Sequence, residues 1–183
     1  MKGSVSQSSN NHICQEARVP HALLLTELIT RLVPGWIGMF DRGLSFMQQA
    51  GIDPQRIVCR HLPQHPDLFA SYNQVDITLD KHPYSGGITT LESLWMGVPV
   101  ITLPGGTFAS RHSASHLTRI GLEELIAGSE EDYISLAVNL ARDLNLLSEL
   151  RLTLRERMKN SVIYDGEKWT RAFEEIIYKT VGY

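Results

Sequence analysis

The amino-acid sequence predicts an α/β fold, a Rossmann-like parallel β-sheet with helices on both faces, followed by a helical C-terminal tail. The first observation behind this prediction is the alternation of short apolar runs with helix-period runs up to about residue 103. Such alternation is typical of parallel sheets. The second is that almost every segment after Ser113 has a helical pattern. The third is that no internal repeat is visible, which argues against repeat architectures.

Four runs are short and apolar, so they are predicted as buried strands. In chain order these strands are 36–40, 56–62, 76–80 and 98–103. The segments before and between them carry apolar residues at three-to-four spacing, which indicates amphipathic helices. The predicted helices are 21–33, 43–51, 65–75 and about 89–96, of which the first stops at Pro34-Gly35 and the second at Gly51.

The C-terminal half is predicted to contain three further helical segments. Ser129-Glu130-Glu131-Asp132 resembles a capping box, with Asp132 where Glu or Gln is more usual. The apolar stripe behind it continues to Leu144, and another helix runs to about Asn160. The last helix, 167–180, places four apolar residues on one face: Trp169, Phe173, Ile176 and Ile177. A long C-terminal helix of this kind often packs against another domain.

Length and composition exclude several classes of protein. The 183 residues allow one domain or one lobe of a larger enzyme, and a hydrophobic content of 43% suits a globular core. The net charge is −3 with both signs interspersed, so no nucleic-acid partner is expected. The seven histidines are scattered rather than set at metal-ligand spacing, and no metal site is expected.

The cysteines and the N-terminus indicate a cytoplasmic protein. Cys14 and Cys59 are too few and too distant for a secreted disulfide framework, so we expect reduced thiols. No apolar run approaches the roughly 18–20 residues that span a bilayer, and no signal peptide is visible. Residues 1–17 are polar and are expected to be disordered or an edge of the expressed piece, which leaves 18–183 as the folded lobe.

The pair Gly86-Gly87 lies between the third predicted strand and a predicted helix start. In open parallel sheets, ligands bind beyond the carboxyl ends of the strands. The first amides of a helix lack partners and carry about half a positive charge, and glycine lets a phosphate approach them. Thr89 and Thr90 add hydroxyl donors, and Glu92 could accept both hydroxyls of a ribose. The stretch therefore offers amides and hydroxyls for the phosphates and a carboxylate for the ribose of a nucleoside diphosphate.

Each of these features also has a plain structural interpretation. Two glycines after a strand are usually a turn, and threonine at a helix start is usually a cap. A glutamate in the first turn usually complements the helix dipole. The coincidence of all three after a parallel strand raises the ligand interpretation to equal standing with the structural one.

Residues 76–127, "DITLDKHPYSGGITTLESLWMGVPVITLPGGTFASRHSASHLTRIGLEELIA", resemble the C-terminal catalytic lobe of the O-linked N-acetylglucosamine transferase family, the SPINDLY-like glycosyltransferases. The family pattern is a strand ending in "LD", then "PYNGGTTT" and "ALWMGVPVVTL", and later "ASR" and "ELIA". The match is long and ungapped, and weaker similarity extends it to roughly residues 50–180. The resemblance implies a GT-B enzyme, in which the C-terminal lobe holds most of the UDP-sugar.

The resemblance also implies roles for the glycine-threonine stretch. It implies that Thr89 and its neighbours, namely Ser85, Gly86, Gly87 and Thr90, meet the diphosphate, and that Glu92 holds the ribose. No metal or other cofactor is implied, because helix amides and side chains neutralise the phosphates. Three departures from the family pattern concern this stretch: Glu92 replaces Asp, Ile88 replaces Thr and Ser85 replaces Asn.

Other site positions stay open at this stage. Leu68 stands where the family has a nucleotide-contacting His, and His65 could substitute for it or be a surface residue, like His61. Arg111 lies near a turn that the fold could bring to the donor site, or it forms a surface ion pair. Residues 1–40 show no counterpart of the family's donor-site lysine, and the catalytic residues are unknown.

We therefore expect the donor-binding lobe of a glycosyltransferase resembling the protein O-GlcNAc transferases, which transfer N-acetylglucosamine from UDP-GlcNAc to Ser or Thr of proteins. The expected partners are the UDP-sugar, a protein acceptor and a missing N-terminal catalytic lobe, with the tetratricopeptide repeats that family members usually carry. The lone chain is expected to be inactive. The alternatives are a glycosyltransferase that acts on a glycan or small molecule, and a non-catalytic interaction domain, which Leu68 and Ile88 would suit.

Overall fold

The computed structural model describes residues 45–57 and 65–182. The predicted helix 21–33, the predicted strand 36–40 and most of the predicted strand 56–62 lie outside these residues, as does the first part of the predicted helix 43–51. Its remainder is helical at 45–49 and ends in a turn at Gly51, whose positive φ of 80° suits glycine.

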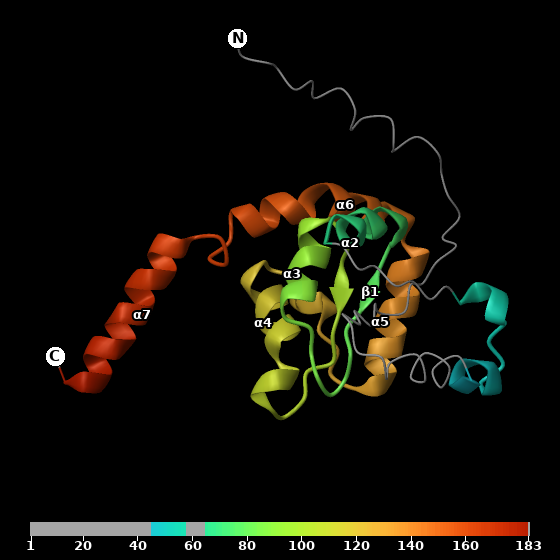
Figure 1. Ribbon diagram of the computed structural model, residues 1–183, viewed down its shortest axis with the longest axis horizontal. Helices are drawn as coiled ribbons and strands as arrows, with labels where there is room; N and C mark the ends of the chain where they lie inside the picture. Colours follow the sequence, from blue (N-terminus) through green and yellow to red (C-terminus); the bar gives the residue numbers. More distant parts are fainter. Residues whose placement is uncertain (1–44, 58–64, 183) are drawn as a thin grey trace, which may run out of the picture.

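Two strands form a parallel pair at the centre of the molecule (Figure 1). Strand β1 is Thr78–Leu79 and strand β2 is Val100–Ile101, with Thr78 opposite Val100 and Leu79 opposite Ile101. A parallel bridge from Thr102 to Ile126 continues the pairing beyond β2. The two predicted strands at 76–80 and 98–103 are therefore confirmed, with fewer residues in regular ladder geometry than the apolar runs suggest.

Helices account for most of the described residues. The α-helices are α2 (His65–Ser71), α3 (Ile88–Trp95), α4 (His112–Arg119), α5 (Glu130–Arg142), α6 (Leu144–Lys159) and α7 (Gly166–Val181). Short 3₁₀ turns lie at Pro54–Arg56, Tyr72–Gln74, Phe108–Ser110 and Glu123–Leu125. The predicted helix 65–75 is thus α2 followed by a 3₁₀ turn, and every helix predicted in the C-terminal half is present.

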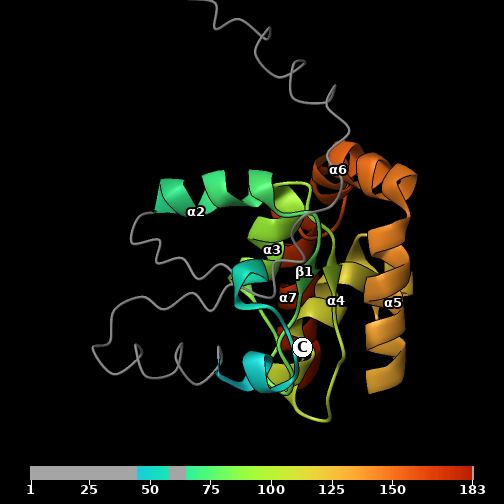
Figure 2. The same ribbon diagram turned by 90° about the vertical axis from the view of Figure 1, so that its right-hand side faces the viewer.

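The core lies between the strands and helices α3 to α6 (Figures 1 and 2). Both α3 and α5 contact β2, and α6 packs across α3 and α5. The largest apolar side chains without solvent contact come from α3, β2, α4, the loop after α4 and α6: Leu94, Ile101, Leu117, Leu122 and Leu154. A second small cluster of Leu68, Tyr72, Val75 and Val98 seats α2 on the body of the protein.

Arg151 of α6 connects α2 to the C-terminal end of α3. Its guanidinium donates to the carbonyl oxygens of Tyr72 and Met96, both at 3.2 Å, and to that of Val75. Carbonyl groups at the ends of helical segments lack partners within the helix, and a cation satisfies them well. The arginine therefore fixes where α2 lies relative to α3, the helix that follows the glycine pair.

Ser129 caps α5 as predicted, because its Oγ accepts the amide N–H of Asp132 at 3.1 Å. The carboxylate of Asp132 accepts the amide N–H of Gly128 at 2.8 Å and makes no bond to the amide of Ser129. A reciprocal capping box would need the latter bond. Only half of the predicted box is therefore formed, at the position where Asp replaces the longer Glu or Gln.

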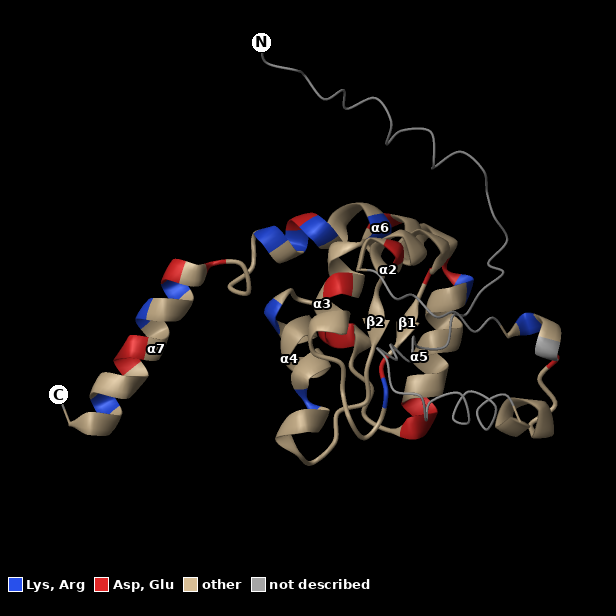
Figure 3. Cartoon of the chain, in the orientation of Figure 1, with Lys and Arg blue, Asp and Glu red and all other residues tan. Residues whose placement is uncertain are grey.

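Helix α7 extends away from the body of the molecule (Figure 1), and none of its residues is buried. Its charged side carries intrahelical pairs, Glu167–Arg171 and Glu175–Lys179, which lie four residues apart (Figure 3). Its apolar side is exposed, with Trp169 and Phe173 stacked at 5.2 Å between ring centroids. The predicted apolar face is present and stays uncovered within the described residues.

Residues 45–57 and 65–182 contain no helix that is both long and apolar enough to cross a membrane.

Candidate functional site

Asp80 organises the turn that follows β1. Its side chain is 7% exposed, and both carboxylate oxygens are occupied: Oδ1 accepts the amide N–H of Gly86 and Oδ2 accepts the hydroxyl of Thr102, each at 2.7 Å. Its backbone carbonyl accepts the hydroxyl of Tyr133 at 2.8 Å. Sequence reasoning did not select Asp80, although a carboxylate directly after a buried strand is a visible signal.

Gly86 is packed too tightly for any side chain. A Cβ atom there would lie 2.6 Å from Oγ1 of Thr90 and 2.9 Å from Oγ1 of Thr89. Gly87, in contrast, is the N-cap of α3 and has open space where a Cβ would point. Among the described residues, no side chain caps α3, so the first amides of this helix have no side-chain acceptor there. The turn therefore offers free backbone donors beside an open space.

A buried hydroxyl network ties the start of α3 to the start of α4. Oγ of Ser85 accepts the amide N–H of Ser113 at 2.8 Å and donates to Oγ of Ser113 at 2.9 Å. The hydroxyls of Thr90 and Ser113 lie 2.7 Å apart, and none of the three side chains is more than 2% exposed. Ser85 and Thr90 thus hold the turn in place from inside. Ser113 was not selected from the sequence, since its partners are more than 20 residues away in the chain.

Thr89 lies at the surface side of the same turn and is half-buried. Its backbone carbonyl accepts the hydroxyl of Tyr72 at 3.3 Å, which links α3 to the 3₁₀ turn after α2. Ile88, one residue earlier, is 74% exposed. Of the two threonines predicted to donate to a phosphate, Thr89 is the one outside the buried network.

Glu92 is a buried carboxylate with a histidine partner. Its side chain is 9% exposed, and Oε1 lies 3.2 Å from Nε2 of His65, which is 52% exposed. Burial raises the pKa of Glu92, and the charge of His65 opposes this shift. The two predicted site residues therefore come together from α2 and α3.

Arg111 lies in the exposed loop before α4. Its Nε donates to the carbonyl oxygen of Gly105 at 3.0 Å, which closes the loop between β2 and α4. The loop also contains Ser110, whose Oγ accepts the amide N–H of Thr107 at 3.1 Å. Arg111 thus bonds a carbonyl oxygen here, while the sequence alone left open a donor-site role and a surface ion pair.

Two further titratable groups lie near Asp80. Burial raises the pKa of Tyr133, and the charge of Asp80 adds to the shift. Burial lowers the pKa of His116 in α4, the charge of His112 lowers it further, and Asp80 opposes both. Within residues 45–57 and 65–182, no group of three or more His, Cys, Asp or Glu is arranged to hold a metal ion.

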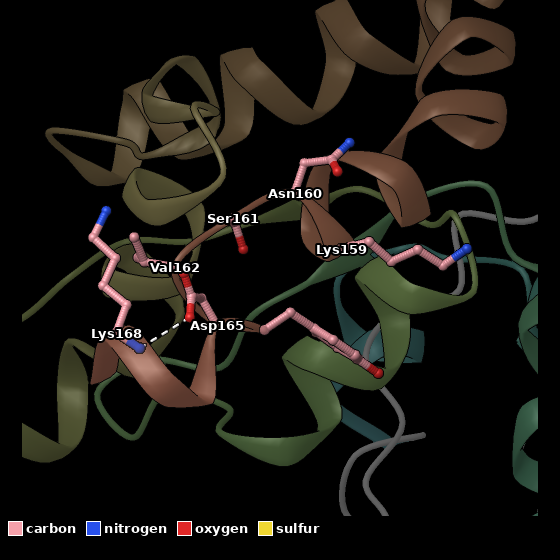
Figure 4. Close-up of a pocket in the computed structure, with 7 residues that line it drawn as sticks. Lys159, Asn160, Ser161, Val162, Asp165 and Lys168 are labelled. Carbon is pink, nitrogen blue, oxygen red and sulfur yellow. Dashed lines mark hydrogen bonds between the residues drawn. The ribbon is translucent and has the colours of Figure 1, made fainter. Parts of the chain in front are cut away.

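A separate hollow of about 370 Å³ lies where α6 passes into α7 (Figure 4). Its lining consists of Lys159, Asn160, Ser161, Val162, Tyr164, Asp165 and Lys168. Asp165 accepts the amide N–H of Lys168 at 2.9 Å and so caps α7. Because Tyr164 stacks on Trp95, the last residue of α3, this hollow lies at the opposite end of that helix from the glycine pair.

Comparison with known proteins finds a glycosyltransferase family and relatives that are described as glycosyltransferases. Residues 40–173 match the family described as glycosyl transferase family 41. The probable UDP-N-acetylglucosamine–peptide N-acetylglucosaminyltransferase SPINDLY of Solanum lycopersicum is 40% identical over 162 residues, which are 87% of this chain and 17% of that protein. The rice SPINDLY is 43% identical over 132 residues, or 72% of this chain and 14% of that protein. The chain therefore spans about a sixth of the length of these relatives.

A more distant relative and a solved structure agree with this. The UDP-N-acetylglucosamine–peptide N-acetylglucosaminyltransferase of Caenorhabditis elegans is 29% identical over 133 residues, which are 73% of this chain and 12% of that protein. The structure of a mutant of the Thermobaculum terrenum O-GlcNAc transferase superposes with a TM-score of 0.71 at 37% identity. The superposition covers 76% of this chain and 27% of the Thermobaculum terrenum chain. The predicted Rossmann-like GT-B lobe is thereby confirmed as the fold class.

Proposed function

The chain belongs to glycosyl transferase family 41, and on this premise we propose that it is the donor-nucleotide lobe of a protein glycosyltransferase. The observation that carries the proposal is the turn at Gly86-Gly87, where uncapped helix amides and a buried carboxylate, Glu92, lie within one and a half turns of α3. Amides at a helix start favour phosphate, and a carboxylate favours ribose hydroxyls. This pairing suits a nucleoside diphosphate.

Each residue has a proposed role that follows from its surroundings. The amides at the start of α3, with Gly87 and the hydroxyl of Thr89, meet the diphosphate. Ser85, Gly86 and Thr90 belong to the same site, as the groups that fix the turn from its buried side. Glu92 accepts ribose hydroxyls, with His65 beside it. We also assign Arg111, whose Nε donates to the carbonyl oxygen of Gly105, as the cation that meets the phosphates.

We propose UDP-GlcNAc as the donor and a Ser or Thr hydroxyl of a protein as the acceptor, as the names of the relatives suggest. Helix amides and Arg111 would neutralise the diphosphate, so no metal is needed. The catalytic and acceptor-binding residues would come from an N-terminal lobe, and tetratricopeptide repeats would lie beyond it. We place the protein in the cytoplasm, because two lone cysteines suit a reducing compartment.

Calorimetry with the isolated chain tests the proposal. UDP should bind more tightly than ADP or inorganic phosphate, and EDTA should leave this binding unchanged. No heat with millimolar UDP would contradict the donor-lobe assignment and favour an interaction domain. Tighter binding of another nucleoside diphosphate, such as GDP, would keep the lobe but change the donor. Product analysis of the full-length protein then separates protein acceptors from glycan or small-molecule acceptors.

A further inference from the structure

The carboxylate of Glu92 is buried, yet only one of its oxygens has a partner. Oε1 pairs with His65 at 3.2 Å, and within residues 45–57 and 65–182 the side chain of Glu92 has no other hydrogen bond or ion pair. The side chain as a whole is 9% exposed. An acceptor that is buried without a partner costs free energy. Within the part of the chain that the structure describes, Oε2 is therefore a vacant acceptor beside the proposed nucleotide site.

Asp80 provides the comparison within the same molecule. It is equally buried, but both of its oxygens accept hydrogen bonds, from Gly86 and Thr102. Each carboxylate oxygen of Asp80 thus accepts a hydrogen bond that helps to hold the turn. Glu92 differs, because among the described residues Oε1 has a partner and Oε2 has none. A carboxylate that is held by one oxygen can accept a hydrogen bond from a ligand with the other.

His65 is well placed to fix this carboxylate. It is the first residue of α2, and its ring lies against Phe69, one turn further on, with 5.2 Å between ring centroids. Helix α2 is itself anchored, because Leu68 packs on Val98 and the following turn is held by Arg151. The position of the imidazole is thus set by packing on one side of α2 and by hydrogen bonds at its end.

We propose that His65 is a positioning residue for ribose recognition: its Nε2–H holds Oε1 of Glu92, and this directs Oε2 to the ribose hydroxyls. The inference rests on the proposed function and deepens it, since it assigns specificity for the ribose to a pair of residues. His65 acts through Glu92 and does not itself contact the nucleotide. The exposed half of the imidazole faces solvent.

The test compares UDP with 2′,3′-dideoxy-UDP by calorimetry on the whole chain. His65→Ala should weaken UDP binding about three- to tenfold, because one hydrogen bond to the carboxylate is lost, and should leave the dideoxy analogue unchanged. His65→Gln, whose side-chain amide can donate from a similar position, should restore most of the affinity. In the double variant His65→Ala/Glu92→Gln, the loss should equal that of Glu92→Gln alone, since the two residues act as one unit.

Asp67→Ala is the matched control, because Asp67 is an exposed residue in the first turn of the same helix. It should weaken α2 without touching Glu92 and should leave the UDP-to-dideoxy ratio unchanged. Equal losses of affinity for both nucleotides in His65→Ala would overturn the proposal and indicate that His65 contacts the nucleotide directly or that the fold is lost. Unchanged affinity for both nucleotides would overturn it as well.

The failure of the proposed function gives a different result. Wild-type protein that binds neither nucleotide contradicts the donor lobe itself, and the positioning role falls with it. Wild-type protein that prefers UDP over the dideoxy analogue, with a ratio that His65→Ala does not change, contradicts only the role of His65.

Discussion

The amide nitrogen of Gly86 donates to Oδ1 of Asp80 at 2.7 Å, and this bond joins the end of β1 to the turn before α3. Because Oδ2 of the same carboxylate accepts from Thr102 beyond β2, one side chain fixes the turn relative to both strands. The start of α3 is thereby held at the carboxyl edge of the sheet, where its first amides can meet a ligand.

Substitution of the two glycines should have unequal effects. Gly86→Ala places a Cβ 2.6 Å from Oγ1 of Thr90, and Thr90 cannot move easily because its hydroxyl is 2.7 Å from that of Ser113. We expect a loss of about 1–3 kcal/mol in the free energy of unfolding, measured with urea. Gly87→Ala meets no atom within 4 Å and has a φ of −109°, so its change should stay within about 0.5 kcal/mol.

The same pair of variants tests the ligand at the turn. If the open space beside Gly87 receives the diphosphate, the added methyl group should weaken UDP binding in a protein that folds normally. Unchanged affinity in Gly87→Ala would move the diphosphate away from this residue, and equal destabilisation by both substitutions would contradict the packing described for Gly86.

Asp80 should stabilise the fold mainly through the hydrogen bonds that its two side-chain oxygens accept. Asp80→Ala leaves two buried donors, the amide of Gly86 and the hydroxyl of Thr102, without an acceptor, at about 1–3 kcal/mol each. Asp80→Asn should cost much less, because its carbonyl oxygen can still accept from Gly86 while its amide donates to Thr102. Urea unfolding of both variants checks this. Equal losses in the free energy of unfolding would show that the charge of Asp80 matters more than its hydrogen bonds to Gly86 and Thr102.

Within residues 65–182, periodicity in the sequence was sufficient to predict the order of strands and helices. The runs 76–80 and 98–103 contain β1 and β2, and the pattern behind Ser129 is α5. These predictions succeed because burial on one face of a helix or on a buried strand leaves a local pattern of apolar residues. The sequence could suggest the residues of the candidate site together, since Gly86, Thr89 and Glu92 lie within one short stretch, and their role toward a ligand stays a prediction.

The groups that support the site were not predictable, because their partners are distant in the chain. Ser113 bonds to Ser85 across 28 residues, and Arg151 reaches Val75 across 76. No local pattern marks a serine or an arginine for such a contact. The pairing of His65 with Glu92 is another case, since the sequence suggested each residue separately and only the packing of α2 on α3 joins them.

The apolar face of α7 should contribute nothing to the stability of the isolated chain. Trp169 is 63% exposed and Phe173 is 48% exposed, so Trp169→Glu/Phe173→Glu should change the free energy of unfolding by less than about 0.5 kcal/mol per site. Leu154→Ala in α6 is the control, because Leu154 is fully buried and its truncation should cost about 2–5 kcal/mol.

The same double variant should reduce self-association, which exposed apolar patches promote. Sedimentation velocity over a range of concentrations measures this for wild type and variant. A wild-type chain that stays monomeric at high concentration would contradict the expectation, as would strong destabilisation of the variant, which would mean that α7 packs on the body in solution.

The last prediction concerns the pH dependence of stability that Glu92 produces. Burial raises the pKa of Glu92 in the folded protein above the ordinary value of 4.5, while the unfolded chain keeps the ordinary value. The folded state therefore binds more protons just above pH 4.5, and stability from this group, complete below that pH, is lost as pH rises through the folded pKa. Glu92→Gln does not titrate, so its stability relative to wild type should increase with pH across this window.

His65 is the ion-pair partner of Glu92, so the comparison needs a background without the imidazole. Urea unfolding of His65→Ala and of His65→Ala/Glu92→Gln between pH 4 and 8 isolates the carboxylate. Since the charge of His65 opposes the shift, its removal should raise the pKa of Glu92 further and extend the window to higher pH. A stability difference that does not vary with pH in either background would mean that the carboxylate is solvated in the folded protein, and the vacant acceptor beside the glycine turn would then not exist.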